Sequence, residues 1–275
     1  MLKSLLRSKQ TLIVPGTFDA LSALIAKQAG FKALYMSGFA VAGSLLAKPD
    51  IGLLTASEMV ERAGQIVTAV GNTPLIADGD NGYGGERDVA RLVNAYEQAG
   101  VQCIQLEDQV SPKRCGHMDN KQVMDREEAI GKISMAVRSR NSEEFLIMAR
   151  TDARATHGLG EALGRGEAFL GAGADLLFIE APETIEEMEI IKREFPETIL
   201  VANMVEEGRT PLLTAAQLSD LGYQIVLRPV AALLAVARTL QLSYAALSEN
   251  GAGESAPARL TFQTYNTLVG LSDDI

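Results

Sequence analysis

Short apolar runs alternate with longer segments of helical periodicity along most of the chain. A short apolar run bounded by polar residues or glycine is typical of a buried strand, and apolar residues three or four positions apart are typical of a helix. The predicted strands are Leu12–Pro15, Ala33–Ser37, Leu75–Asp78, Cys103–Glu107, Phe145–Arg150, Leu176–Glu180, Ile199–Asn203 and Ile225–Arg228. The predicted helices are Ala20–Ala29, Ser57–Val70, Glu86–Gln98, Arg126–Arg138, Gly160–Gly171, Ile185–Phe195, Ala215–Leu221 and Ala231–Ser248.

Eight strand–helix alternations predict an α/β protein built as a (β/α)8 TIM barrel. A Rossmann-like sheet with a second domain is the alternative, but it needs a glycine-rich fingerprint after the first strand, and Pro15-Gly16-Thr17-Phe18 is not one. Because no linker divides the chain, we expect residues 1–275 to form one barrel domain. The barrel would cover about residues 1–250, and 251–275 would be a helical tail with a helix at Ala258–Leu271.

Composition and charge narrow the class of protein. The chain has 275 residues, of which 47% are hydrophobic and 22% charged, as in soluble globular proteins. The net charge of −10 argues against nucleic acid and anionic membranes as partners. The N-terminal residues lack the apolar core of a signal peptide, so we expect a cytoplasmic protein. Of the two cysteines, Cys103 stands in an apolar run and is expected in the core.

Polar residues stand at the carboxyl end of nearly every predicted strand. Since these ends meet at one face of a barrel, where barrel active sites are built, the residues should converge on one pocket. They are Ser37, Asp78, Asp80, Glu107, Asp108, Arg150, Asp152, Glu180, Asn203 and Arg228. A single acid at such a position can also be a helix cap. The set as a whole predicts a site.

Three of these residues, Asp78, Asp80 and Glu107, form an all-oxygen set. Carboxylates suit Mg²⁺ or Mn²⁺, which keep several waters when bound to protein. Such an ion could polarise a carbonyl and stabilise an enolate. The segment Asp80–Gly85 is also rich in turn-forming residues, and the two interpretations are compatible.

The segment after the fourth strand carries a candidate reactive thiol. Cys115 is flanked by Lys113, Arg114 and His117, and neighbouring cations stabilise a thiolate relative to a thiol. The loop at residues 109–125 is long enough to act as a mobile lid. His117 could belong to the site or only to the loop, and His157 is expected to be a loop residue.

In combination, several motifs resemble the isocitrate lyase/phosphoenolpyruvate mutase superfamily over roughly residues 10–250. The motifs are Tyr35-Met36-Ser37-Gly38, Lys48-Pro49-Asp50, Ala77-Asp78-Gly79-Asp80-Asn81-Gly82-Tyr83-Gly84, Glu107-Asp108-Gln109, Pro112-Lys113-Arg114-Cys115-Gly116-His117, Ala149-Arg150-Thr151-Asp152, Glu180 and Asn203. The resemblance implies a Mg²⁺-dependent barrel that makes or breaks a bond next to an α-keto acid. It also implies a homotetramer whose last helix is swapped between subunits.

The same resemblance implies roles for single residues. Asp78 would bind the metal directly, with Asp50, Asp80 and Glu107 acting mostly through water. Ser37, the Gly38 amide and Arg150 would hold the keto-acid carboxylate. Tyr35 would lie beside the oxygen that loses its proton, and Cys115 would be the acid that protonates an enolate carbon. Lys113 and His117 are counted with the catalytic residues, and Gly116, Glu180 and Asn203 with those that contact substrate.

The lid motif Cys115-Gly116 resembles the lyase branch of this family, because the mutase and phosphonopyruvate hydrolase branches typically carry Asn there. Two arginines that grip the third carboxylate in methylisocitrate lyases align with Leu234 and Tyr265. Since burying a carboxylate without a cation is costly, the resemblance implies a malate-like dicarboxylate. Arg228 is a candidate anchor for its distal carboxylate, and Phe39 adds an apolar wall.

The expected reaction is therefore a retro-aldol cleavage of a 2-substituted malate to an α-keto acid such as pyruvate and a carboxylate. Oxaloacetate hydrolysis or decarboxylation and methylisocitrate cleavage are the alternatives within the lyase branch. Phosphonopyruvate or carboxyphosphonoenolpyruvate chemistry is a further alternative. A non-catalytic keto-acid-binding homologue is the alternative from a different class.

Overall fold

The computed structural model describes residues 2–118, 120–251 and 258–271. The chain divides into two compact units, Met1–Ala231 and Ala232–Ile275. The sequence placed the barrel's end near residue 250. The observed division falls earlier, at the start of the long C-terminal helix, because many apolar residues of that helix are exposed instead of buried in a core.

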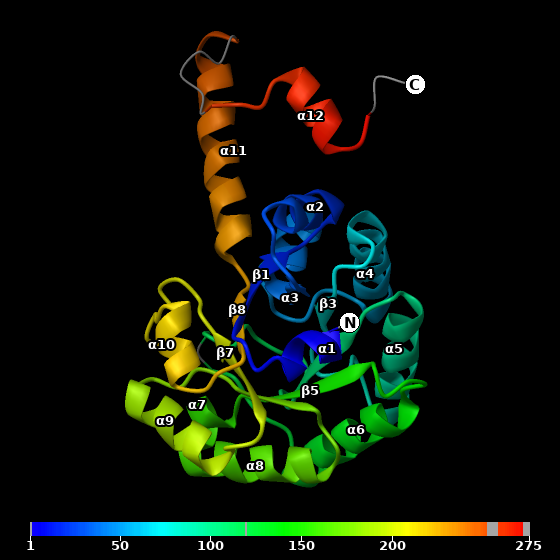
Figure 1. Cartoon of the computed structure of the whole chain (residues 1–275), viewed down its shortest axis with the longest axis vertical. Helices are drawn as coiled ribbons and strands as arrows, with labels where there is room; N and C mark the ends of the chain where they lie inside the picture. Colours follow the sequence, from blue (N-terminus) through cyan, green and yellow to red (C-terminus); the bar gives the residue numbers. More distant parts are fainter. Residues whose placement is uncertain (1, 119, 252–257, 272–275) are drawn as a thin grey trace. The chain divides into compact units, whose positions relative to one another are not determined.

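The first unit is built on a closed barrel of eight parallel strands, with β1 paired to β8, and the predicted (β/α)8 fold is confirmed (Figure 1). The strands are β1 (Leu12–Thr17), β2 (Leu34–Met36), β3 (Leu75–Asp78), β4 (Cys103–Glu107), β5 (Leu146–Thr151), β6 (Leu176–Ile179), β7 (Ile199–Asn203) and β8 (Ile225–Arg228). All eight predicted strands are present, with ends that differ by no more than two residues. Most are buried along their whole length, which is why they read as apolar runs.

Helices connect the strands and surround them (Figure 1). Those predicted are α2 (Ala20–Gln28), α4 (Ala56–Val70), α5 (Glu86–Gln98), α6 (Arg126–Ser139), α8 (Leu159–Gly171), α9 (Ile185–Glu194) and α10 (Ala215–Asp220). Those not predicted are α1 (Leu2–Arg7), α3 (Gly38–Val41), the π-helical turn η1 (Ala42–Leu46) and α7 (Ala153–His157). None of the four exceeds six residues, which is too short for a helical period to be read.

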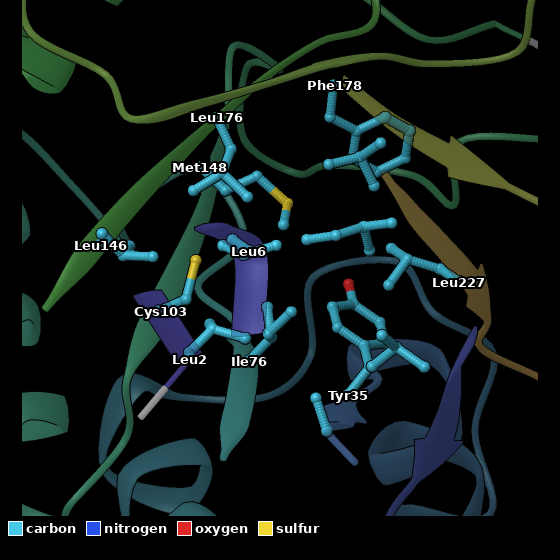
Figure 2. Packing of buried hydrophobic residues seen from close by; sticks show 14 residues of the cluster. Leu2, Leu6, Tyr35, Ile76, Cys103, Leu146, Met148, Leu176, Phe178 and Leu227 are labelled. Carbon is cyan, nitrogen blue, oxygen red and sulfur yellow. The ribbon is translucent and has the colours of Figure 1, made fainter. Parts of the chain in front are cut away.

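The barrel interior is an apolar core, and α1 closes one end of it. Leu2 and Leu6 of this helix are 0% and 3% exposed and pack among strand residues such as Ile76, Cys103 and Leu146 (Figure 2). The Leu2 amide also donates a hydrogen bond to Gln102 Oε1 at 2.8 Å. Cys103 is a core residue, as expected. The opposite end of the barrel is left for polar residues.

The second unit contains α11, which begins at Ala231 and ends at Asn250, and α12 (Phe262–Leu268). Large apolar side chains of both helices are exposed, including Leu234, Leu240, Tyr244, Phe262 and Tyr265. By length and composition alone, Ala231–Glu249 could also cross a membrane, a weak criterion that helices of soluble proteins can meet. The predicted tail helix Ala258–Leu271 is observed in a shorter form, as α12.

Candidate active site

The polar strand ends converge at the carboxyl face of the barrel. The β4–β5 register pairs Glu107 with Arg150, so that a carboxylate and a guanidinium from neighbouring strands face the same space. A cavity of about 40 Å³ lies there. The predicted site residues that line it are Tyr35, Ser37, Phe39, Asp50, Asp78, Glu107, Lys113, Cys115, Gly116, His117, Arg150 and Asn203.

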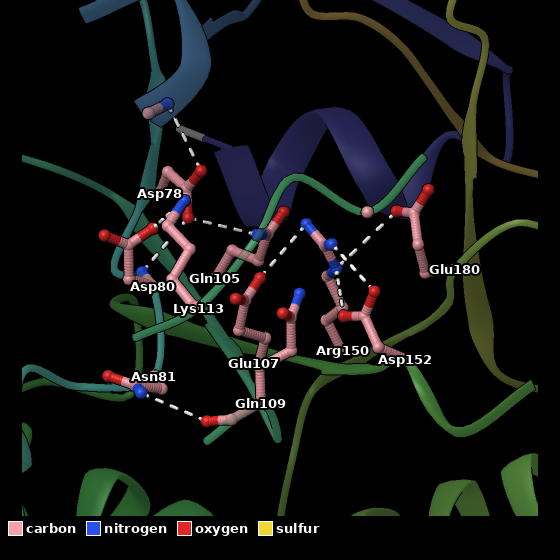
Figure 3. A network of polar contacts seen from close by, with 12 residues as sticks. Asp78, Asp80, Asn81, Gln105, Glu107, Gln109, Lys113, Arg150, Asp152 and Glu180 are labelled. Carbon is pink, nitrogen blue, oxygen red and sulfur yellow. Dashed lines mark hydrogen bonds and ion pairs between the residues drawn. The ribbon is translucent and has the colours of Figure 1, made fainter. Parts of the chain in front are cut away.

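Four buried acids, Asp50, Asp78, Asp80 and Glu107, and the lysine Lys113 form the first half of this site. Figure 3 shows Asp78, Asp80 and Glu107 with Lys113. The Lys113 ammonium lies 2.5 Å from Asp50 Oδ1 and 2.7 Å from Asp80 Oδ1. Although burial opposes the charge on Lys113, Asp80 and Asp50 raise its pKa well above the usual value. The amides of Gly38 and Asp80 donate to the two oxygens of Asp78, at 3.2 and 3.1 Å. The loop lysine is therefore ionised and committed to the acids.

The acids themselves are in an environment that disfavours their negative charge. Burial, and then Asp80, raise the pKa of Asp78 to about 6. Burial also raises the pKa of Glu107 well above its usual range. Within the described part of the chain, Glu107 Oε1 is buried without a hydrogen-bond partner. A cation placed among these oxygens would relieve both penalties.

The oxygen-only donor set therefore fits a hard divalent cation. In the described ranges, no three carboxylate, histidine or cysteine side chains stand close enough to enclose an ion by themselves. Mg²⁺ does not need such a cage, since one or two carboxylates and several waters complete its octahedron. The geometry fits an ion held by few direct ligands.

Arg150 dominates the second half of the site (Figure 3). Its guanidinium lies 3.2 Å from Glu107 Oε2, 2.9 Å from Asp152 Oδ2 and 3.5 Å from Glu180 Oε2. It also lies over the Phe178 ring, 5.3 Å from the centroid. These contacts fix a buried guanidinium at the pocket wall, where a planar pair of donors suits a carboxylate.

A chain of side-chain hydrogen bonds joins Tyr35 to the acids. The Tyr35 hydroxyl donates to Gln105 Oε1 at 3.0 Å, and Gln105 Nε2 donates to Asp78 Oδ1 at 3.2 Å. Burial and the charge of Asp78 raise the pKa of Tyr35 well above 10, so its phenol stays protonated. Ser37 lines the same pocket and its hydroxyl caps α3, accepting from the Ala40 amide at 3.3 Å.

Cys115, on the loop between β4 and α6, is half-buried and lines the cavity. Burial raises its pKa to about 11, although a backbone hydrogen bond from His117 and the charge of Arg150 oppose this. The expectation that neighbouring cations stabilise a thiolate is wrong. Lys113 points to Asp50 and Asp80, and Arg114 is exposed. Cys115 is a neutral thiol near pH 7, the form that can donate a proton.

His117 connects the same loop to β6 and β7. Its Nδ1 accepts from the Arg209 amide at 3.1 Å, and its Nε2 lies 3.0 Å from Glu180 Oε1. Because Nδ1 is used as an acceptor, the ring proton of the neutral form sits on Nε2, towards Glu180. Asn203 Nδ2 donates to both Glu180 oxygens at 3.2 Å. Glu180 therefore contacts three of the lining residues, His117, Asn203 and Arg150, and is not itself among them.

Arg228 does not lie at the pocket. Its guanidinium donates to the Leu213 carbonyl at 3.2 Å and lies 3.8 Å from Glu206 Oε1. The prediction that Arg228 anchors a distal carboxylate is wrong, because its side chain points to the β7–α10 connection. Apolar residues that line the pocket include Phe39, Val205, Leu227, Pro229 and Val230. Leu234 and Tyr265 belong to the second unit.

Two residues that hold the site were not predicted as site residues. Gln105 connects Tyr35 to Asp78, and Lys121, within the lid, contacts Asp152, a predicted residue that in turn contacts Arg150. Gln105 had a readable signal, since a polar residue inside an apolar strand must find a partner. Lys121 carries no such signal, because a lysine in a polar loop is normally exposed.

The model of the phosphoenolpyruvate phosphomutase family matches residues 2–247. The chain belongs to this family. The superfamily expected from the sequence is thereby confirmed, and the match covers nearly the whole barrel.

Individual relatives cover almost all of the chain. The 2,3-dimethylmalate lyase of Eubacterium barkeri is 46% identical over 271 residues, 98% of this chain and 93% of the relative. A structure of oxaloacetate acetylhydrolase with 3,3-difluorooxalacetate is 33% identical, with a TM-score of 0.94 over 98% of this chain and 92% of that one. A phosphonopyruvate hydrolase complexed with oxalate and Mg²⁺ is 31% identical, with a TM-score of 0.87 over 98% and 93%.

Proposed function

We propose that this enzyme is a carbon–carbon lyase that cleaves an alkyl-substituted malate to an α-keto acid, such as pyruvate, and a second carboxylate. One observation carries the proposal: Cys115, whose thiol stays protonated, lines the same small cavity as Arg150. The guanidinium suits the carboxylate of a keto acid, and the thiol suits the delivery of a proton to a carbanion. The 46% identity to a 2,3-dimethylmalate lyase supports the same reaction class.

In this reaction the substrate hydroxyl on C2 loses its proton to a pocket carboxylate, and the C2–C3 bond breaks as the C2 carbonyl forms. The bond's electron pair stays on C3 as an enolate of the departing carboxylate, and Cys115 protonates that carbon. Tyr35, whose phenol keeps its proton, would donate a hydrogen bond near the oxygen. Arg150, Ser37 and the Gly38 amide would hold the keto-acid carboxylate.

We infer that Mg²⁺, with Mn²⁺ as a substitute, is the cofactor. Asp78 would be its direct ligand, with Asp50, Asp80 and Glu107 holding its waters. When bound, the ion polarises the keto-acid oxygens and stabilises negative charge on them. The raised pKa of Asp78 and the unpartnered Glu107 Oε1 among the described residues support a cation here. The Mg²⁺ in the phosphonopyruvate hydrolase complex supports it from a relative.

The pocket walls support an alkyl group instead of a third carboxylate. Among the lining cations, Lys113 is paired with acids, Arg150 is assigned to the keto-acid carboxylate, and Arg114 is exposed, so none of them is left for a third carboxylate. Phe39, Val205, Leu227, Pro229 and Val230 add an apolar wall to the same pocket. A carboxylate buried against that wall would be uncompensated, which is costly, whereas methyl groups gain by leaving water. A substituted malate therefore fits better than methylisocitrate.

Oxaloacetate hydrolysis is the second candidate, because it uses the same keto-acid half-site. The likeness to the oxaloacetate acetylhydrolase complex, with a TM-score of 0.94, favours it over phosphonopyruvate chemistry. It differs from alkylmalate cleavage in needing a water instead of an alkyl group beside the reacting carbon.

The deciding test is a panel of 2-methylmalate, 2,3-dimethylmalate, 2-methylisocitrate, oxaloacetate and phosphonopyruvate. Each is incubated with Mg²⁺ and with EDTA, and keto-acid or oxalate release is measured. We expect Mg²⁺-dependent pyruvate release from the alkylmalates. Release from oxaloacetate alone would favour the second candidate.

The role of Cys115 is tested by Cys115→Ser, which should abolish turnover and leave Mg²⁺-dependent pyruvate binding intact. Full activity in that variant would overturn the mechanism. Cys103→Ser is the matched control for thiol loss, since Cys103 is in the core and outside the pocket.

We also infer that the protein is a cytoplasmic homotetramer with its C-terminal helix swapped between subunits. The exposed apolar side chains of α11 and α12 support an assembly that covers them. Light scattering after gel filtration measures the mass. A monomer, or a protein that partitions into vesicles through Ala231–Glu249, would overturn the inference.

A further inference from the structure

Lys121 is a buried lysine in a loop whose neighbouring residues are exposed. Only 7% of the residue and 1% of its side chain are accessible, whereas Asn120 and Gln122 are exposed. Burying an ammonium costs free energy that only close partners offset. The contacts that Lys121 makes at the barrel rim must therefore offset this cost, and they point to a function for the buried ammonium.

The Lys121 ammonium has two partners. It lies 2.8 Å from Asp152 Oδ1, just after β5, and it donates to the Gly116 carbonyl of its own loop. Gly116 lies next to Cys115 and directly above Arg150 and Glu180. One side chain thus joins the cavity-facing segment of the loop to a fixed carboxylate of the barrel.

Asp152 is the fixed partner because the barrel holds it from several sides. Its amide donates to Asp108 Oδ1 at 2.9 Å. Its Oδ2 accepts from Arg150 Nε at 2.9 Å, and its Oδ1 accepts from Arg150 Nη2 at 3.1 Å. Burial acts against the charge, but Arg150 and Lys121 lower the pKa of Asp152 well below its usual range, so it stays ionised. Asp152 Oδ1 is shared by the pocket guanidinium and the loop ammonium.

We propose that Lys121 is a positioning residue that latches the 109–125 loop over the pocket by joining the Gly116 carbonyl to Asp152, the carboxylate that also orients Arg150. Lys121 itself does not line the cavity. The latch makes closure of the loop and orientation of the guanidinium depend on one carboxylate. The proposal rests on the proposed function only in taking Arg150 as the anchor of the keto acid.

The first test measures loop closure without any substrate. Lys121→Met keeps the length of the side chain and removes its charge. The loop should therefore open more often and make Cys115 more accessible. We expect iodoacetamide to alkylate Cys115 at least about tenfold faster than in the unmodified enzyme, a change of about 1.4 kcal/mol in the opening equilibrium. Peptide mass spectrometry follows each cysteine separately, and Cys103, fully buried in the core, reports global unfolding.

Lys132→Met is the matched control. Lys132 is also 7% exposed and donates to a backbone carbonyl, that of Asn81 at 3.1 Å, but it contacts neither Gly116 nor Asp152. Its loss should leave the Cys115 rate unchanged. A Cys115 rate in Lys121→Met equal to that of the unmodified enzyme would overturn the latch, as would an equal acceleration in the control.

If Lys121→Met also exposes Cys103, the comparison moves to Asp152→Asn, which keeps the volume and removes the shared charge. The same acceleration at Cys115 with Cys103 protected supports the latch, and the unmodified rate overturns it. Steady-state kinetics then distinguish the latch role of Lys121 from the anchoring role of Arg150. Lys121→Met should lower kcat at least about tenfold while the Kd for pyruvate changes less than about twofold, since Asp152 still holds Arg150.

The alkylation test of the latch and the substrate test of the function have independent outcomes. Should no substrate in the panel be turned over, the alkylation rates still decide the latch. Should turnover occur with an unaltered Cys115 rate in both variants, the proposed function stands and the latch does not.

Discussion

Gly116 brings the lid close against Arg150 and Glu180, and Gly116→Ala tests whether that approach is needed. A Cβ at this position would lie 2.4 Å from Arg150 Nη2 and 2.7 Å from Glu180 Cδ. Neither neighbour can retreat easily, because Arg150 is held by Glu107 and Asp152. The φ angle of Gly116 lies outside the left-handed region, so alanine strains no backbone there and the conflict is steric alone.

The cost can be bounded from general experience with overpacking. Adding a methyl group to a filled site costs about 1–3 kcal/mol, and each 1.4 kcal/mol is a factor of ten. Since the loop escapes the clash by opening, the cost falls on closure instead of on folding. We therefore expect kcat/KM to fall roughly 5- to 150-fold and the Tm to stay within about 2 °C.

The assay pairs keto-acid release with a thermal melt, and Gly160→Ala is the control. Gly160 lies in α8, is exposed, and has nothing within 4 Å of the position of an added Cβ. In a helix that change is neutral or stabilising by up to about 1 kcal/mol, so kcat/KM should be unaltered. If Gly116→Ala kept full kcat/KM, the closed loop would not be the reactive state. A large fall in Tm would show instead that the cost falls on folding.

Three further predictions concern the thiol, the acids and the barrel end. Because the Cys115 pKa is raised to about 11, its alkylation rate should rise about tenfold per pH unit from pH 7 to 10, and a plateau near pH 9 would contradict the buried environment. The pKa of Asp78 is raised to about 6, so below that pH protons compete with the metal for its carboxylate. Calorimetry should therefore find that the affinity for Mg²⁺ falls as the pH drops from 7 to 5. A constant affinity would show that Asp78 is not a ligand. Leu6→Ala should lower the free energy of unfolding in urea by about 2–5 kcal/mol, as a buried leucine does, whereas Leu21→Ala, 39% exposed, should cost within about 0.5 kcal/mol.

The strands were predictable because this fold gives each of them a largely apolar sequence. A parallel strand covered on both faces must be apolar along its length, so β3, β4, β7 and β8 begin and end at the predicted residues. The helix α1 was not predictable in the same way. Its two buried leucines are recognised only once the barrel end that receives them exists. A contact of this kind depends on residues a hundred positions away, such as Gln102.

The sequence predicted which residues gather at the site better than it predicted their chemical roles. Strand ends converge whatever their sequence separation, which brought Asp78, Glu107 and Arg150 together as expected. Side-chain direction is a different matter. Arg228 also ends a strand, but its guanidinium found the Leu213 carbonyl and Glu206 outside the pocket. The position of a residue along a strand fixes where its backbone lies, but the direction of a long side chain depends on the partners within its reach.

The lid shows the same principle at closer range. Lys113 and Cys115 are two residues apart, and in sequence the lysine stands where it would lower the thiol's pKa. In the folded loop, the ammonium is drawn to Asp50 and Asp80, whose combined charge outcompetes a neutral thiol as its partner. The thiol is left at a small cavity, where burial decides its protonation. A cysteine in this setting acts as a proton donor because its cationic neighbour is used elsewhere.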